Sequence, residues 1–172
     1  GVPWDKALQP IMDAKCVSCH NGTPGPANYS YTLIDTSVMP ATPTTITFDL
    51  RGIAAPMLDE NLSTYSMSHL SLIGPDRILS EPNSPLELAP GSAMPKSFVT
   101  PSSARGSALI KKLNPVRMSP TVDMNVRAFN TATHPQDVGG TALTADEIYL
   151  FTLMADMGGQ FISRENLPGN GY

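Results

Sequence analysis

The chain has 172 residues and a formal net charge of −4 at pH 7, and 41% of its residues are hydrophobic. This length suits one domain with its own core and is short for two. The acidic balance and the absence of long basic runs argue against nucleic acid or anionic lipid as a partner. No segment of the sequence approaches the roughly 18 consecutive apolar residues of a membrane span, so we expect no membrane insertion by this chain.

The first predicted element is a helix over residues 4–16, because apolar residues recur there at the spacing of one helix face. This apolar stripe consists of Trp4, Leu8, Ile11 and Met12. Pro10 is expected to kink the helix or to delay its start, since proline cannot donate a backbone hydrogen bond.

Residues 23–101 contain 11 of the 17 prolines, together with many Ser and Thr. We therefore expect a loop-rich insertion there rather than a long helix. Two runs within it, Ser30–Ile34 and Thr44–Leu50, are rich in strand-forming residues, and the second alternates polar and apolar side chains. They predict a short β-hairpin. A short helical turn is expected around residues 61–72.

Helical periodicity returns after Pro101. Ser102 or Ser103 is expected to begin a helix that runs to Leu113, because both follow the proline and precede apolar residues at helix spacing. Residues 116–141 contain two prolines and little periodicity, which predicts an irregular segment.

The last predicted helix begins at a capping box. Thr144 and Glu147 have the spacing at which each side chain can bond the other residue's backbone amide. The buried stripe of this helix is expected to consist of Ile148, Phe151, Met154 and Ala155. Gly158-Gly159 is expected to end it, and residues 161–172 to form an extended tail.

The motif Cys16-Val17-Ser18-Cys19-His20 follows the first predicted helix. Two residues between the thiols let both sulfurs reach the two vinyl groups of one porphyrin edge, and the adjacent histidine then points its imidazole at the iron. The motif predicts one covalent haem c, with Cys16 and Cys19 forming the thioethers and His20 the proximal axial ligand. A thioredoxin-like redox pair would need a strand before the motif, and a zinc site would need a further ligand cluster.

Three stretches of the sequence resemble a known family: Pro10–His20, Ser103–Ile110 and Leu143–Gln160. The order of amphipathic helix, motif, long loop, apolar helix and capped helix resembles the class I cytochrome c family. More narrowly, the three stretches are similar to the cytochrome c domains related to the C-terminal part of the hydrazine synthase alpha subunit. The synthase has a tyrosine a few residues after the motif, whereas the fourth residue after His20 is Pro24, so hydrazine chemistry is not expected.

This resemblance implies a mainly α fold, in which the first and last helices form a cytochrome c-like core around one covalent haem. We predict a single monohaem domain over residues 1–172. Its parts are a core of residues 3–22 and 102–160, a proline-rich insertion of residues 23–101 that contains the hairpin, and a tail of residues 161–172. Because haem thioethers are made after export in most bacteria, the expected location is the periplasm or the cell exterior.

A second axial ligand is expected, because both axial positions of an electron-transfer haem are usually filled. Simple cytochromes place this ligand in the segment before the last helix, so the resemblance favours His134, which would otherwise be a surface loop histidine. The alternatives are Met124, Met118, His69 and Met94. For Met12 and Met154, which lie on apolar helix faces, core packing is the expectation.

The expected function is one-electron transfer by an iron that cycles between Fe(III) and Fe(II), six-coordinate and bis-histidine if His134 binds, with no catalytic residue. Two alternatives stay open. One is a catalytic or gas-binding haem domain of a larger redox enzyme, and the other is a haem-bearing docking module in a multi-haem complex or filament. The expected partners are redox proteins or other haem domains.

Overall fold

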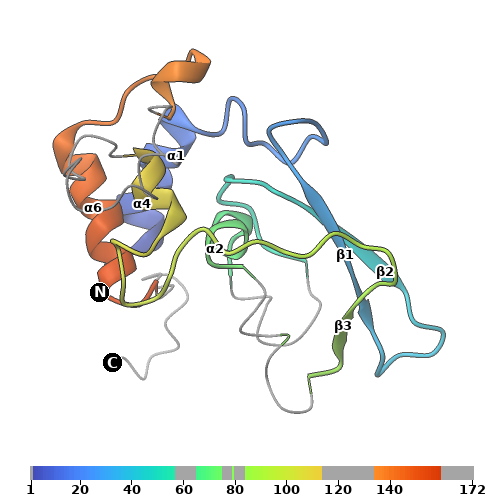
Figure 1. Cartoon of the computed structure of the whole chain (residues 1–172). Coiled ribbons are helices and arrows are strands. Elements are labelled where there is room, and N and C mark those ends of the chain that lie inside the picture. Colours follow the sequence, from blue (N-terminus) through green and yellow to red (C-terminus); the bar gives the residue numbers. More distant parts are fainter. Residues whose placement is uncertain (1, 57–64, 75–78, 80–83, 114–133, 160–172) are drawn as a thin grey trace, which may run out of the picture. The chain divides into compact units, whose positions relative to one another are not determined.

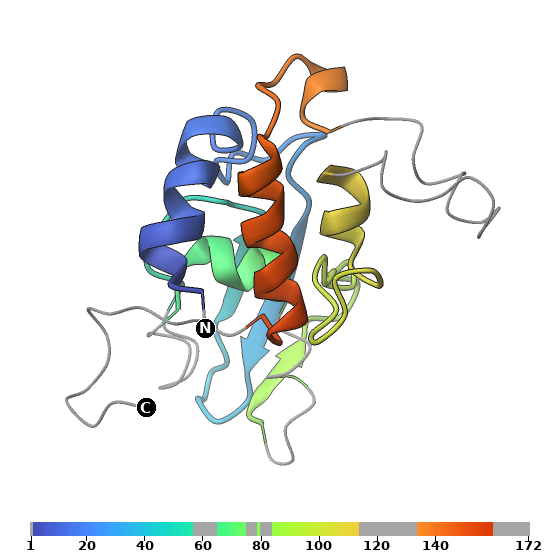
Figure 2. The same ribbon diagram turned by 90° about the vertical axis from the view of Figure 1, so that its left-hand side faces the viewer.

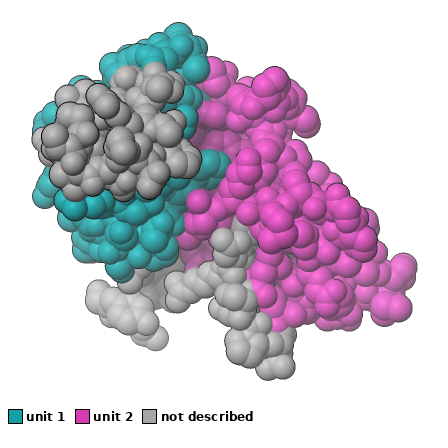
Figure 3. Space-filling model, viewed as in Figure 1, with its two compact units in different colours: residues 1–16, 98–172 teal, residues 17–97 magenta. Residues whose placement is uncertain are grey.

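The computed structural model describes residues 2–56, 65–74, 79, 84–113 and 134–159. The chain divides into two compact units, coloured separately in Figure 3. Unit 1 consists of residues 1–16 and 98–172, and unit 2 of residues 17–97. The organisation into a single domain with an insertion stays a prediction, and the predicted tail lies outside the described residues.

The prediction of a mainly α fold is wrong. Helices are combined with a three-stranded antiparallel sheet, so the protein mixes α and β structure. The sheet is built entirely from the proline-rich segment that was expected to be mostly loops. Its contribution was underestimated because one of its strands is only three residues long, too short for an alternating pattern to be detected.

Unit 1 begins with a helix in two parts. A π-helical segment, η1 (Trp4–Leu8), continues into α1 (Gln9–Lys15), with Pro10 in the first turn of α1. Proline is tolerated there because the first amide groups of an α-helix have no partner within the helix. The predicted apolar stripe of Trp4, Leu8, Ile11 and Met12 is buried.

The capped helix is α6 (Ala145–Asp156), and it begins and ends as predicted. The Thr144 hydroxyl accepts a hydrogen bond from the Glu147 amide, and the Glu147 carboxylate accepts one from the Thr144 amide. Phe151, Met154 and Ala155 are buried, while Ile148 is half-buried. Figure 2 shows α6 flanked by the N-terminal helix and by α4 (Ala108–Leu113), and it contacts both η1 and α4.

The helix expected from Ser102 or Ser103 begins only at Ala108, as α4. Ser102 has a left-handed backbone with a φ of 63°, and its amide bonds the Ala155 carbonyl at the end of α6. The Ala104 amide bonds the Asp156 carboxylate at 2.7 Å. Because a left-handed residue is not part of a right-handed α-helix, no helix begins at Ser102, and the tertiary bonds hold this segment in its irregular path.

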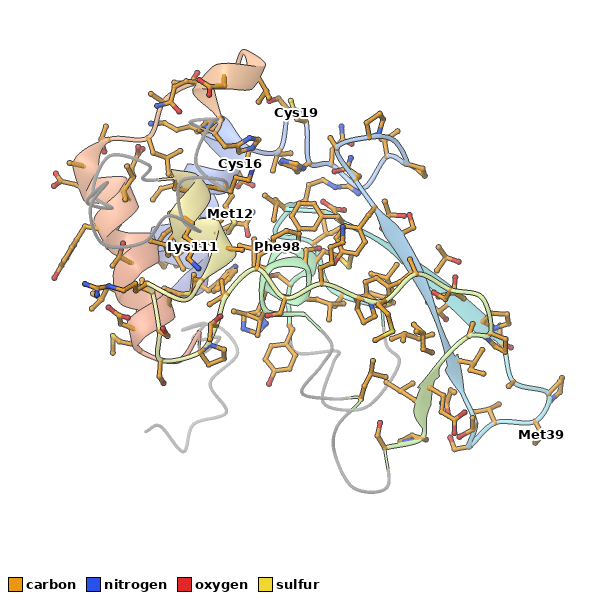
Figure 4. The ribbon with its side chains drawn as sticks, viewed as in Figure 1. Met12, Cys16, Cys19, Met39, Phe98 and Lys111 are labelled. Atoms are coloured by element: carbon orange, nitrogen blue, oxygen red, sulfur yellow. The ribbon has the colours of Figure 1, made fainter. Side chains whose placement is uncertain are left out.

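Unit 2 contains the sheet, with strand order β2-β1-β3. Strands β1 (Ser30–Asp35) and β2 (Pro43–Thr47) form the predicted hairpin, with Tyr31 paired to Ile46. Strand β3 (Leu86–Leu88), which was not predicted, pairs antiparallel with the end of β1. Met39 lies in the turn between β1 and β2 (Figure 4), and its side chain is exposed.

Helix α2 (Met67–Ile73) packs against one face of this sheet (Figure 1). It lies in the segment where a helical turn was expected, and the Ser66 side chain caps it by accepting a bond from the His69 amide. Alternate strand residues point to the same face of a sheet, so one face supplies an apolar layer. The resulting core contains Tyr31, Leu33, Ile46, Ala55, Met67, Leu70 and Leu86.

Candidate functional site

The Cys-x-x-Cys-His motif follows directly from the end of α1. Residues 16–19 form turns, and the Cys16 amide still bonds the Met12 carbonyl in helical fashion at 2.8 Å. Cys16 is half-buried and is the last N-terminal residue of unit 1, whereas the exposed Cys19 belongs to unit 2 (Figure 4). Neither cysteine is in a disulfide, so both thiols are chemically suited to thioether formation.

The imidazole of His20 is fixed by its Nδ1 atom. Nδ1 lies 3.0 Å from the Ala27 carbonyl oxygen and 3.1 Å from the Asn28 Oδ1 atom. A backbone carbonyl can only accept a hydrogen bond, so Nδ1 carries the proton. In a neutral imidazole the other nitrogen, Nε2, then has the lone pair that binds a metal.

Two further contacts hold His20 within unit 2. The Phe48 ring meets the imidazole edge to face, with the ring centroids 5.0 Å apart. The Leu50 amide donates to the His20 carbonyl at 2.8 Å. The ring and the backbone of His20 are therefore both held by the segment that follows β2.

The loop between His20 and β1 is closed by Asn28, whose side chain is buried. Its Nδ2 group donates to the Cys19 carbonyl at 3.1 Å and to the Thr23 carbonyl at 2.8 Å. The Asn28 amide also donates to the Gly25 carbonyl, which forms the turn that delivers the Ala27 carbonyl to His20. One buried amide thus connects Cys19, His20 and the loop.

An ion pair lies beside this loop. The buried Asp49 carboxylate accepts hydrogen bonds from the Arg51 guanidinium, the shortest at 2.6 Å, and residue 49 bridges to Asn21. The hydrogen bonds and the charge of Asp49 raise the pKa of Arg51 above its ordinary value. Gly22 packs on this pair, because a Cβ atom there would lie 2.7 Å from an Asp49 carboxylate oxygen.

The other candidate ligands lie in different surroundings. His134 belongs to unit 1, is half-buried, and precedes Pro135 and a 3₁₀ turn, η4 (Gln136–Val138). His69 and Met94 belong to unit 2. His69 stacks on the Tyr65 ring with centroids 4.9 Å apart, and Met94 is 71% exposed.

Met118 and Met124 lie outside the described residues. Met12 and Met154 are buried, as expected for core residues. None of the predictions for the sixth ligand is tested by these placements, and His134 stays the favoured residue on the sequence resemblance.

Sequence reasoning did not find the residues that hold His20. Ala27 acts through its backbone carbonyl, which no side-chain pattern can reveal. Asn28 is separated from the motif by a loop, and Phe48 by that loop and the strand pair. An Asn eight residues after a ligand histidine is by itself an ordinary turn residue. Its contact with His20 can be recognised only in the folded loop.

In the part of the chain that the structure describes, no three His, Cys, Asp or Glu residues form a group that could hold a metal ion. Iron in a porphyrin is held differently, because the porphyrin nitrogens bind it and the protein adds only axial ligands. None of the described helices is long and apolar enough to cross a membrane. Comparison of the chain with protein-family models, curated proteins and solved structures found no match.

Proposed function

We propose that this protein is a one-electron carrier with a haem c attached covalently to Cys16 and Cys19 and bound axially by His20. The observation that carries the proposal is the bond from His20 Nδ1 to the Ala27 carbonyl, immediately after two thiols at haem-attachment spacing. A metal-binding histidine usually donates its second ring N–H to a carbonyl or carboxylate, which fixes the tautomer and the ring orientation. The surroundings of His20 meet this requirement.

The haem would supply an iron that changes between Fe(III) and Fe(II). The protein residues have separate tasks around it. The two thiols anchor the group, and His20 presents Nε2 in a fixed direction because Ala27 and Asn28 hold Nδ1. Phe48 packs edge to face against the imidazole and restricts the rotation of the ring. A ligand held this rigidly keeps its geometry when the iron changes charge, which suits electron transfer.

We further propose that the protein works in the periplasm or outside the cell and exchanges electrons with redox proteins or other haem domains. The location follows from the Cys16–His20 motif, because the thioethers are made after export in most bacteria. The partners follow from the proposed one-electron transfer. His134 remains the proposed sixth ligand.

The decisive experiment is expression of the full chain together with a c-type cytochrome maturation system. We expect one haem to stay attached after denaturation, as measured by the intact mass of the protein. A Cys16→Ser/Cys19→Ser double variant should lose the covalent haem, while Ser18→Ala, between the two thiols, should keep it. Wild-type protein without covalent haem would contradict the proposal.

Absorption spectra of the haem-containing protein then separate electron transfer from the other functions. We expect low-spin spectra in both oxidation states that carbon monoxide does not change, because both axial positions are filled. A carbon monoxide complex would favour a catalytic or gas-binding haem. His134→Ala should convert the reduced protein to a high-spin form that binds carbon monoxide, and an unchanged low-spin spectrum would exclude His134 as the sixth ligand.

A further inference from the structure

The orientation of the Asn28 side chain is determined by its surroundings. Two of its neighbours, the carbonyl oxygens of Cys19 and Thr23, only accept hydrogen bonds, so the Nδ2 group must face them at 3.1 and 2.8 Å. The opposite end of the carboxamide, Oδ1, therefore faces His20 Nδ1 at 3.1 Å. Because Nδ1 carries a proton, this contact is a hydrogen bond that Asn28 accepts.

The Nδ1 proton of His20 thus has two acceptors of different kinds. The Ala27 carbonyl belongs to the main chain, whereas Asn28 contributes a side chain. An acceptor at Nδ1 makes the imidazole a stronger donor at Nε2, and a stronger axial donor favours the oxidised metal. Asn28 is buried, with 5% of its surface exposed, so water cannot easily replace Oδ1 as an acceptor of the Nδ1 proton.

We propose that Asn28 is the positioning residue of the proximal ligand: its Oδ1 atom shares the Nδ1 proton of His20 and thereby sets the reduction potential, while its Nδ2 group closes the loop over residues 19–28. This inference rests on the proposed function, because it assigns a role toward the axial histidine. It goes further in naming a side chain whose chemistry tunes that histidine.

Two substitutions at this position have opposite expected effects on the haem-containing protein. Asn28→Asp replaces the amide by a stronger, charged acceptor, and it should shift the ratio of oxidised to reduced protein about tenfold toward the oxidised form, a potential about 59 mV lower for one electron. Asn28→Ala removes the acceptor without adding charge and should raise the potential. Both variants also lose the Nδ2 bonds to the Cys19 and Thr23 carbonyls, so loosening of the loop alone would move their potentials in the same direction.

Asn21→Asp is the matched control. Asn21 lies in the same loop and its Oδ1 atom accepts a bond from the Thr23 amide at 3.0 Å, which a carboxylate preserves. This variant adds the same charge, but residue 21 accepts its bond from Thr23 and not from His20 Nδ1, so its shift in potential should be less than about a third of the shift in Asn28→Asp. Equal shifts in potential in both Asp variants would show that the added charge alone causes the effect, and they would overturn the proposal.

A second measurement uses the wild-type chain and Asn28→Ala without haem. Exchange of the His20 Nδ1 proton with solvent, followed by NMR, should be several-fold faster in the variant, because one of two acceptors is lost. Unchanged exchange would overturn the role of Asn28. If wild-type protein carries no covalent haem, the proposed function fails, but this exchange experiment still tests whether Asn28 holds His20.

Discussion

Gly22 shows how one residue keeps the ligand loop in place. Its backbone φ is +77°, a conformation that strains any residue with a side chain, and a Cβ atom would collide with the Asp49 carboxylate at 2.7 Å. Gly22→Ala should therefore lower the free energy of unfolding by at least about 1 kcal/mol, measured by denaturant titration of the full chain.

Gly25 provides the comparison, because it lies in the same loop, has no positive φ and has open space where a Cβ atom would lie. Gly25→Ala should change the free energy of unfolding by less than about 0.5 kcal/mol, as most exposed substitutions do. Similar losses in the two variants would show that the ion pair and the backbone of Gly22 do not restrict this position.

At the scale of residues, sequence reasoning could find the groups that carry chemistry but not those that hold them. Cys16, Cys19 and His20 were identifiable because attachment chemistry fixes their spacing. The acceptors of His20 are a backbone carbonyl and an amide, and their role depends on how the intervening loop turns. The assignment of haem itself stays a prediction.

At the scale of elements, the segment before α4 contains a strained residue. Ser102 has a φ of 63°, which glycine adopts without steric cost. Ser102→Gly should therefore raise the free energy of unfolding by about 0.5–1 kcal/mol, seen as a higher midpoint in thermal or denaturant unfolding.

Ser103→Gly should have the opposite sign, because the Ser103 hydroxyl accepts a hydrogen bond from the Gly106 amide at 3.1 Å. Removing this bond and adding backbone freedom should destabilise the protein by about 1 kcal/mol. If both glycine variants were destabilised equally, strain at residue 102 would not be the cause.

The elements differ in how well their sequences predict them. Helix α6 was predictable because its capping box and its glycine stop are local signals. The start of α4 was not, because Ser102 is left-handed and because bonds to the Ala155 carbonyl and the Asp156 carboxylate, far away in sequence, hold residues 102 and 104 in an irregular segment. Strand β3 likewise depends on pairing with β1 rather than on its own three residues.

At the scale of the whole molecule, a polar contact joins distant parts of the chain within unit 1. The Lys15 ammonium bonds the Glu147 carboxylate at 2.5 Å and the Ala142 carbonyl at 2.8 Å, across more than 120 residues. Burial raises the pKa of Glu147, but the bonds from Lys15 and Thr144 outweigh this effect and hold the pKa below its ordinary value.

The direction of this shift predicts how stability depends on pH. A carboxylate with a lowered pKa in the folded state stabilises the protein above its unfolded-state pKa, and this stabilisation is lost as the pH falls through the folded-state pKa. The difference in unfolding free energy between wild type and Glu147→Gln should be largest near pH 7 and should shrink below pH of about 4. Asp146→Asn, an exposed neighbour on α6, serves as the control, and a pH profile of Glu147→Gln parallel to that of wild type would contradict the assignment.

The fold class of the whole chain could not be predicted because the sheet arises in a segment dominated by prolines. Prolines occupy turns and strand ends there, as Pro43 does at the start of β2, without preventing the pairing of β1 with two neighbours. Composition indicates where helices are absent, but it does not show how short strands combine.

The bonds at the His20 ring and within its loop also bear on the order in which the protein folds. The partners of the Nδ1 atom lie seven and eight residues further along the chain, and the Asn28 bond to Cys19 spans nine. Closing loops of this size costs less chain entropy and is faster than forming contacts between segments far apart in sequence. We therefore expect the ligand loop to organise early in folding, before β1 has a partner strand, so that Phe48 and Leu50 arrive at a histidine already oriented.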